Sequence, residues 1–183
     1  MKVTEAIRSR RTIHTFSNEQ VPREIIERSI DAANHAPCHR MTFPWRFTKL
    51  GKKQRELLFH LQVQIKLGGK SMEGQKVEKI RNKILNPSHL LVASQVSTNN
   101  ELQKLEDYAA CACAIQNLSL SLVSEGVGSK WSTGRITTES KTYEIVGINP
   151  TEEEIIGFIW IGYGDPPPPI ARPSITSVFR EKS

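Results

Sequence analysis

The sequence predicts a mixed α+β fold in which helices cover a small central sheet. Hydrophobic residues make up 38% of the 183 residues, enough for one domain with one substantial core. The predicted elements run in the order two helices, strand, helices, strand, long helix and strand, which is not the strict alternation of a doubly wound sheet. We therefore expect a single domain over residues 1–183, ending in an extended tail at 165–183.

The N-terminal part of the chain predicts two helices followed by a strand. Thr4 is placed to cap a helix that runs to about Arg10. Pro22 suits the first turn of a second helix, whose apolar residues recur on one face until the helix stops before Pro37. The segment 44–50 alternates and is rich in aromatic residues, which indicates a strand.

The middle of the chain predicts one strand between helices. Apolar residues at helical spacing mark a helix over 57–65, which Gly68-Gly69 ends. Residues 70–86 are strongly charged with little apolar periodicity, so they fit either a surface helix or a mobile lid. Residues 89–96 carry few charges and predict a buried strand. The longest predicted helix covers 105–124, and its small central side chains allow another backbone to approach closely.

The C-terminal part predicts one short helix, one buried strand and a tail. Residues 129–134 are typical of a short polar loop, and residues 139–146 of a short helix. The run 154–163 is continuously apolar, as expected of a central strand buried on both faces. The prolines at 166–169 favour an extended, polyproline II conformation. We expect the tail to pack against a partner subunit through its apolar residues, which are Ile170, Ile175, Val178 and Phe179.

The charge of the chain favours an anionic ligand. Net charge is +6 and the isoelectric point is about 9.3, which allows a phosphorylated ligand or a nucleic acid. The charge is spread along the chain without an aromatic-basic motif, so we expect no nucleic acid. No apolar run is long enough to span a membrane, and Glu5 and Arg8 interrupt any signal-peptide core. We therefore expect a cytoplasmic protein with no membrane partner.

Several familiar catalytic arrangements are missing from the sequence. It has no Gly-x-Ser-x-Gly elbow and no Walker phosphate loop. Gly126 and Gly128 follow a helix, whereas a Rossmann fingerprint lies between a strand and a helix. His35 and His39 are four residues apart, but Pro37 breaks the helix that would align them on a metal ion. We predict no metal site and assign no catalytic residue.

A cluster of cations and hydroxyls near the N-terminus is the strongest candidate for a binding site. Residues 8–14 contain three arginines, two hydroxyls and a histidine. Such donors suit a phosphate group, although a solvated basic helix end is the simpler alternative. If the polar loops at 35–42 and 129–134 and the tail around Arg172 converge on this segment, they surround a flat phosphorylated cofactor. Trp131 would then supply an aromatic ring.

Three segments of the sequence resemble motifs of the FMN-dependent nitroreductases. R-S-R-R-T at 8–12 resembles their R-R-S or R-x-S opening. A-P-C-H-R-M-T-F-P-W-R-F at 36–47 resembles their A-P segment, which ends in Q-P-W-x-F. A-C-A-I-Q-N-L at 112–118, with E-G-V-G-S-K-W at 125–131, resembles their Q-N helix and G-x-G-x-x-W loop. The matches follow the family's order over nearly the whole chain and look most like its small YdjA-type members.

The resemblance implies an architecture as well as a cofactor. It implies an α+β fold with a small, mainly antiparallel central sheet, assembled as an obligate homodimer. Two FMN molecules would lie at the subunit interface, with NADH or NADPH as co-substrate. Each C-terminal tail would wrap the partner subunit.

The resemblance also assigns cofactor-binding roles to individual residues. Arg10, Arg11 and Thr12 would contact the phosphate and ribityl groups of FMN. His14 stands where larger relatives often carry lysine, near the pyrimidine edge of the flavin. The remaining assignments are His35, His39 (reaching the partner's flavin), Trp131, Ser132, Thr133 and, in the tail, Arg172. His35, His39 and Trp131 also have structural alternatives, as a helix end, a loop residue and a core residue.

By this resemblance the protein is an FMN-containing oxidoreductase. It would pass hydride from NAD(P)H, through the flavin, to a small electrophilic acceptor such as a nitro compound or a quinone. The sequence departs from the family pattern at Phe43, where glutamine is usual, and at His14, which is a cation only when protonated. These two changes leave an alternative open, a flavin storage or sensor protein with little turnover.

Overall fold

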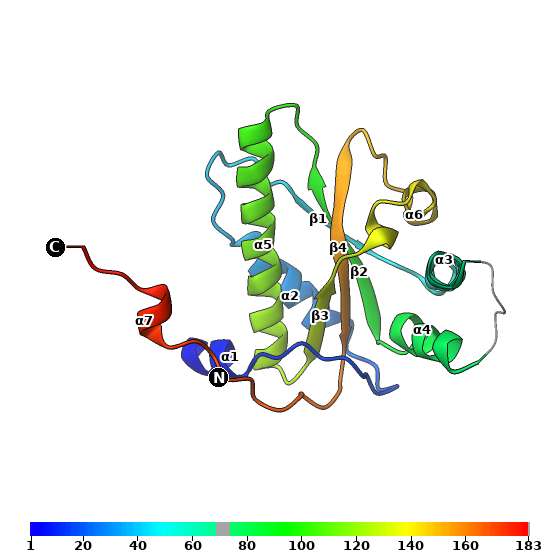
Figure 1. Cartoon of the computed structure of the whole chain (residues 1–183), viewed down its shortest axis with the longest axis horizontal. Coiled ribbons are helices and arrows are strands. Elements are labelled where there is room, and N and C mark those ends of the chain that lie inside the picture. The colour runs from blue at the N-terminus through cyan, green and yellow to red at the C-terminus, as the bar shows by residue number, and fades with distance from the viewer. Residues whose placement is uncertain (69–73, 183) are drawn as a thin grey trace.

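The computed structural model describes residues 1–68 and 74–182, which form three layers with the sheet in the middle (Figure 1). Two helices, α5 and α2, cover one face of the sheet, and α3, α4 and α6 cover the other. The elements in chain order are α1 (Val3–Ser9), α2 (Arg23–Asn34), β1 (Trp45–Lys49), α3 (Lys52–Leu67), α4 (Gln75–Leu85), β2 (His89–Val96), α5 (Glu101–Ser124), β3 (Gly128–Ser132), a 3-10 helix η1 (Arg135–Thr137), α6 (Ser140–Val146), β4 (Glu153–Gly162) and α7 (Ile175–Val178). This mixture confirms the α+β class.

The described sheet has four strands in the order β1-β2-β4-β3, and every neighbouring pair is antiparallel. The two central strands, β2 and β4, are the two that the sequence predicts to be buried, and β2 has the predicted bounds. One extra residue, Ile156, bulges out of β4, because Ala93 pairs with Gly157 and Ser94 with Ile155. The small antiparallel sheet implied by the family resemblance is therefore confirmed.

The prediction of a polar loop at 129–134 is wrong for residues 129–132. Residues 128–132 form β3, an edge strand whose Lys130 pairs with Trp160 of β4 and whose Trp131 pairs with Ile159. The polar and small residues of this stretch hide a strand because it is short and only one of its edges is bonded to the sheet. Alternation along the strand sends Trp131 toward α5 and Lys130 toward the opposite face.

Two helix starts differ from the predicted ones. The first helix is capped by Lys2 and not by Thr4, since the Glu5 carboxylate accepts a hydrogen bond from the Lys2 backbone N–H at 3.0 Å. The long helix α5 begins at Glu101, earlier than predicted, because the Asn100 side chain accepts from the backbone N–H of Gln103 at 3.0 Å. Side-chain caps thus extend both helices.

The charged segment 70–86 falls partly outside the described residues, which exclude 69–73. Its described part forms α4, with Val77, Ile80 and Ile84 buried on one face. Their i, i+3, i+7 spacing is a helical periodicity that the many surrounding charges conceal. The surface helix is therefore the correct one of the two interpretations for residues 75–85.

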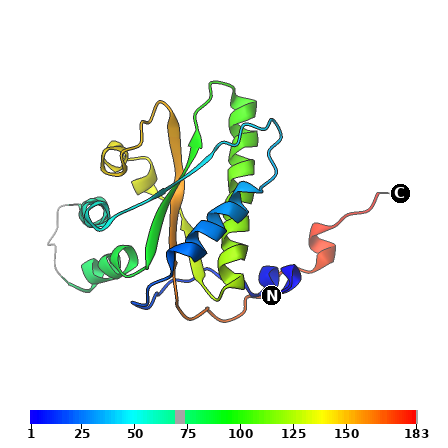
Figure 2. The same cartoon turned by 180° about the vertical axis from the view of Figure 1, so that it is seen from behind.

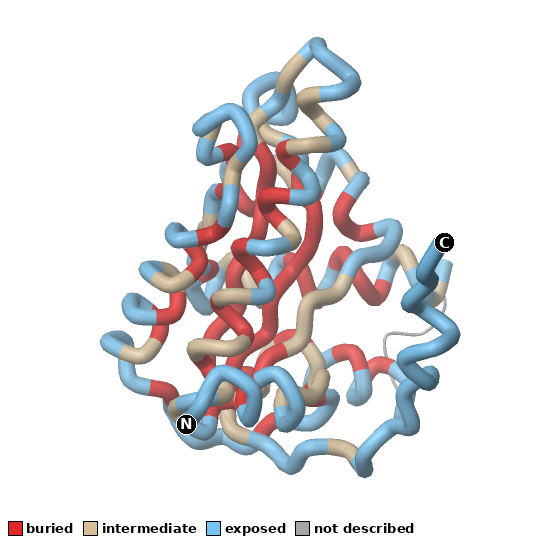
Figure 3. Tube along the Cα trace, turned by 90° about the vertical axis from the view of Figure 1, so that its left-hand side faces the viewer, coloured by how far each residue is buried: buried red, intermediate tan, exposed pale blue. Residues whose placement is uncertain are grey.

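Two hydrophobic clusters lie on opposite faces of the sheet. Figure 3 shows in red the buried residues, which are concentrated in the strands and the helix faces against them. The cluster under α3, α4 and α6 contains the large rings of Phe59, Phe158 and Trp160. The cluster under α5 and α2 contains small residues such as Ala110 and Ala114, which let α2 cross close to α5, as Figure 2 shows. The small side chains of the long helix serve the close helix contact that the sequence predicts.

The C-terminal tail leaves the body of the chain after β4 and runs past α1 (Figures 1 and 2). Its four apolar residues are all exposed in the single chain, namely Ile170, Ile175, Val178 and Phe179. Their packing against a partner subunit stays a prediction. Among residues 1–68 and 74–182, none of the helices is long and apolar enough to cross a membrane.

Candidate functional site

The cationic N-terminal segment lies directly against β3. Thr12 forms a bridge to Ser129, and the backbone N–H of Ile13 donates to the Ser129 carbonyl at 3.1 Å. Gly128 permits this approach, because a Cβ there would lie 2.3 Å from Cγ1 of Ile13. Two segments that are far apart in the sequence, 10–14 and 128–132, are therefore brought together.

A cavity of about 200 Å³ opens beside this contact, between the segment and the C-terminal half of α5. Arg10, Arg11 and Ser129 contribute to its wall. Arg11 Nη1 donates to the carbonyls of Arg8 and Arg10 at 2.6 and 2.9 Å, so part of its guanidinium closes the end of α1. The guanidinium of Arg10 and the hydroxyl of Thr12 make no hydrogen bond within the described part of the chain. This donor set fits a phosphate group.

His14 has a lysine beside it that the sequence did not single out. Lys130 Nζ lies 3.1 Å from Nδ1 of His14. An ammonium group can only donate, so Nδ1 accepts and the neutral ring keeps its proton on Nε2. Burial, followed by the charge of Lys66, lowers the pKa of Lys130. The cation at this position thus comes from β3 and does not require His14 to be protonated.

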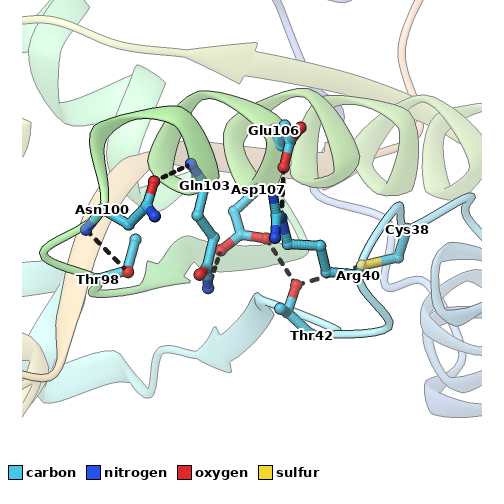
Figure 4. Close-up of polar contacts among 8 residues, drawn as sticks. All are labelled: Cys38, Arg40, Thr42, Thr98, Asn100, Gln103, Glu106 and Asp107. Carbon is cyan, nitrogen blue, oxygen red and sulfur yellow. Dashed lines mark hydrogen bonds and ion pairs between the residues drawn. The ribbon is translucent and has the colours of Figure 1, made fainter.

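The loop 38–43 is fixed to the N-terminal half of α5 by side-chain contacts (Figure 4). The Thr42 hydroxyl donates to the buried Asp107 carboxylate at 2.6 Å, and Arg40 Nε donates to Glu106 at 2.8 Å. The hydrogen bond from Arg40 is the main reason that the pKa of Glu106 lies below its usual value. These contacts hold the loop rigidly against α5.

Two residues of the same loop have strained backbones. Met41 has a φ of 52° and Phe43 a φ of 44°, values that side chains with a Cβ rarely adopt. Met41 is 75% exposed and Phe43 48% exposed, so neither side chain gains burial in the single chain. Strain kept at exposed residues is typical of functional loops.

The structure does not bring His35 and His39 to the cationic segment. Both histidines are exposed, and His35 Nε2 lies 3.9 Å from Asp31. Their loop is tied to α5 at Glu106, whereas the cavity of Arg10 includes Val123 of the same helix. At 1.5 Å per helical residue, these two points are about 25 Å apart. The single chain therefore keeps His39 apart from Arg10. His35 lies nearer the middle of α5, since Asn117 donates to the Ala32 carbonyl one turn before it at 3.3 Å.

The three predicted residues at 131–133 are divided between the core and the surface. Trp131 is half-buried, its indole N–H donates to the Ile156 carbonyl at the bulge at 3.3 Å, and its ring lies 6.4 Å from that of Tyr108. A Cβ at Gly157 would come within 2.2 Å of this indole nitrogen, so glycine makes room for the ring. Core packing thus explains much of Trp131. Ser132 is half-buried, while Thr133 is exposed and lines a cavity of about 430 Å³ together with Tyr108.

Arg172 lies in the exposed tail, where the single chain does not bring it near the other candidates. Two residues of the site were missed by sequence reasoning, Lys130 and Asp107. Lys130 was missed because the sequence predicts a loop where β3 lies. The second is an acidic residue on the buried face of α5, and its burial between apolar positions was the available signal.

Comparison with known sequences identifies relatives over nearly the full chain. A sequence model described as "Nitroreductase family" matches residues 7–163. A protein of Bacillus subtilis (strain 168) named "Putative NAD(P)H nitroreductase YfhC" is 31% identical over 171 residues, covering 92% of this chain and 87% of its own. The similarly named YdjA of Escherichia coli (strain K12) is 23% identical over 163 residues, covering 88% of each chain.

Comparison with solved structures identifies the same fold. The crystal structure of a nitroreductase-like family protein from Bacillus cereus has a TM-score of 0.82 and 22% identity, covering 100% of this chain and 96% of the other. A nitroreductase from Desulfovibrio desulfuricans, solved in complex with FMN, has a TM-score of 0.76 and 18% identity, covering 100% and 98%. At these identities the likeness shows a shared architecture.

Proposed function

Because this chain belongs to the nitroreductase family, we propose that it is an FMN-containing, NAD(P)H-dependent flavin oxidoreductase. It passes hydride from the nicotinamide to a small electrophilic acceptor such as a nitro compound or a quinone. The observation that carries the proposal is the contact of the segment 10–14 with β3, which gathers phosphate-binding donors beside a cavity. The FMN-bound relative from Desulfovibrio desulfuricans supports the choice of cofactor.

The donors beside this cavity fit the phosphate end of FMN. Arg10, Arg11 and Thr12 would hold the phosphate and the adjoining ribityl hydroxyls. Arg10 and Arg11 line the cavity, whose described wall contains no carboxylate, and Thr12 follows them in the chain. Lys130 and His14 lie next along the chain's surface and would place positive charge near the ring system. When bound, FMN supplies the hydride chemistry, while the protein orients it and sets its electrostatic surroundings.

A homodimer is part of the proposal, because one chain separates its candidate groups. His39 lies near one end of α5 and the arginines near the other, so two copies related by a twofold axis could form two complete sites. Exposed apolar side chains at Leu102, Leu105 and Tyr108 of α5 favour such a contact, and the apolar tail does so too. His39, Trp131, Ser132, Thr133 and Arg172 would then line the flavin from both subunits. Light scattering should give twice the mass of the 20.6 kDa chain.

The visible absorption spectrum of the purified protein tests the proposed function. We expect a flavin spectrum that NADH or NADPH bleaches without oxygen, and that a quinone or nitro compound then restores. A colourless protein that cannot be reconstituted with FMN would refute the proposal. A yellow protein that neither nucleotide bleaches would favour the alternative, a storage or sensor protein. The Lys130 cation beside His14 speaks against that alternative.

A further inference from the structure

A groove between α3 and α4 is walled mainly by lysines. It has a volume of about 390 Å³ and is lined by Lys66, Leu67, Lys76, Lys79, Ile80 and Lys83. Three of the lysines follow the i, i+3, i+7 spacing on α4, which directs them to one face of the helix. The groove therefore presents several ammonium groups to one small volume.

Two further contacts extend this positive charge to the candidate flavin site. Lys83 Nζ lies 4.8 Å from the centre of the Trp160 ring. Trp160 is the strand partner of Lys130, whose Nζ lies 3.1 Å from His14. Lys83 and Lys130 thus lie between the groove and the segment that contains Arg10 and Thr12.

The lysines of this region have no ion-pair partner in the part of the chain that the structure describes. In the described ranges, none of Lys66, Lys76, Lys79, Lys83 and Lys130 forms an ion pair with a carboxylate. Burial, together with the charges of Lys130 and Lys66, lowers the pKa of Lys83 to about 8. Ammonium groups that are crowded without counter-charges are stabilised by a bound anion.

A buried donor adds to this excess. The indole Nε1 of Trp160 has no hydrogen-bond acceptor among residues 1–68 and 74–182. Its ring packs beneath Lys83, so the inner end of the cationic region also lacks an acceptor. One buried hydrogen-bond donor beside Lys83 is thus left without an acceptor in the described ranges.

We propose that Lys66, Lys76, Lys79 and Lys83 bind the anionic group, a phosphate or a carboxylate, of the small molecule that exchanges hydride with the flavin. This inference rests on the proposed function and narrows its substrate class to anionic reaction partners. The apolar side chains of Leu67 and Ile80 suit the organic part of such a molecule. The FMN phosphate has its own donors at Arg10 and Thr12, so the groove offers charge beyond what the cofactor needs.

The decisive experiment compares more anionic with less anionic reaction partners, using the FMN-loaded protein. The acceptors are 4-nitrobenzoate and its methyl ester, and the nucleotides are NADPH and NADH, which differ by one phosphate. In Lys76→Gln/Lys79→Gln we expect kcat/KM to fall about fivefold to tenfold for the more anionic member of one pair, and less than twofold for the other member. Lys66→Gln should have the same selective effect from the opposite wall. The pair whose kcat/KM values change unequally shows whether the acceptor or the nucleotide carries the anionic group that the groove binds.

A matched control and a binding measurement complete the test. Lys52→Gln/Lys53→Gln also removes two positive charges, from the first turn of α3, about 20 Å from Lys66. It should leave the ratio of kcat/KM values within each pair unchanged. Inorganic pyrophosphate, titrated into the FMN-loaded protein by calorimetry, should bind about tenfold more weakly to Lys76→Gln/Lys79→Gln than to the control.

Three results would overturn the inference. The first is an equal loss, or no loss, for the two members of both pairs, and the second is an equal loss in the control variant. The third is release of FMN from the lysine variants with both ratios unchanged, because the groove would then serve the cofactor. A wild-type protein that never takes up FMN refutes the proposed function instead. The same pyrophosphate titration, carried out on the FMN-free wild type, Lys76→Gln/Lys79→Gln and control, then still decides whether the groove binds an anion.

Discussion

The contacts of α5 and the groove between α3 and α4 differ in how their charged side chains are paired. On the α5 face, charged side chains find partners, as in Arg28 with Glu125 at 2.6 Å and Arg40 with Glu106 at 2.8 Å. On the α3–α4 face, Lys66 and Lys83 lie near Lys130, and the described residues give them no carboxylate partner. Figure 1 shows these faces on opposite sides of the strands.

The difference separates residues that maintain the fold from residues that are available to a ligand. A charge that is paired with an opposite charge on another element links the two elements and is already compensated. An unpaired and partly buried cation is costly in the free protein, and that cost is recovered when an anion binds. The same reasoning distinguishes Arg10, whose guanidinium makes no described hydrogen bond, from Arg11, which partly closes α1.

The largest effect on stability is expected at Asp107 of α5, which binds the loop 38–43. This buried carboxylate accepts from Thr42 at 2.6 Å and from Gln103 at 3.3 Å. Asp107→Ala leaves both donors unsatisfied, so we expect the free energy of unfolding to fall by about 2–3 kcal/mol. Urea denaturation measures the change. Asp31→Ala, on the exposed surface of α2, is the control, and an equal effect of both substitutions would show that the buried contact has no special role.

A smaller change in stability, of opposite sign, is expected at Lys83 in the groove between α3 and α4. Lys83→Met removes a cation that burial and like charges disfavour, at the cost of its contact with the Trp160 ring. We expect the variant to be more stable by about 1 kcal/mol at pH 7, because partial exposure screens much of the repulsion. Lys79→Met, at an exposed position of the same helix, should change the stability much less.

The pH dependence of stability checks the reason for this gain. The folded pKa of Lys83, about 8, lies below its ordinary value of 10.5, so the unfolded state binds more protons between these pH values. The wild-type free energy of unfolding should therefore rise from pH 8 to 10.5, and the advantage of Lys83→Met should shrink over that range. An advantage that is constant with pH would attribute the gain to packing and not to charge.

The smallest effect is expected at the exposed ion pair of Arg40 and Glu106. Arg40→Gln should lower Tm by only about 1–2 °C, because exposed pairs contribute little. Loss of the Arg40 hydrogen bond should raise the pKa of Glu106 toward its ordinary value of 4.5, which an NMR titration can follow. The pair stabilises the fold above that pH and ceases to do so as pH falls below it. A large drop in Tm would show that this pair, and not Asp107, fixes the loop.

Most of the fold could be predicted because its elements carry strong local signals. The uninterrupted apolar runs of β2 and β4 and the small residues of α5 indicate burial directly. The edge strand β3 could not be recognised, because its polar residues are stabilised by pairing with β4, which is a long-range interaction. The buried stripe of α4 was obscured by the lysines and arginine between its apolar residues.

The sequence alone could point to candidate site residues only where they lie close together in the chain. Arg10 and Thr12 belong to one short segment, so the sequence alone is enough to propose a joint role for them. Lys130 could not be linked to His14, since that contact depends on the register of β3 and on a bridge to Ser129. The separation of His39 from Arg10 along α5 likewise depends on tertiary packing, and no local pattern encodes it.

The affinity for FMN of two neighbouring arginine variants tests most directly whether the segment 10–14 anchors the cofactor. Arg10 borders the cavity beside β3, whereas Arg8 is exposed on α1. In a fluorescence titration of the apoprotein, Arg10→Ala should weaken FMN binding by roughly 1.5–3 kcal/mol, which is about tenfold to a hundredfold. Arg8→Ala should bind FMN like the wild type. Unchanged affinity in Arg10→Ala would contradict the assignment and show that the phosphate is held elsewhere.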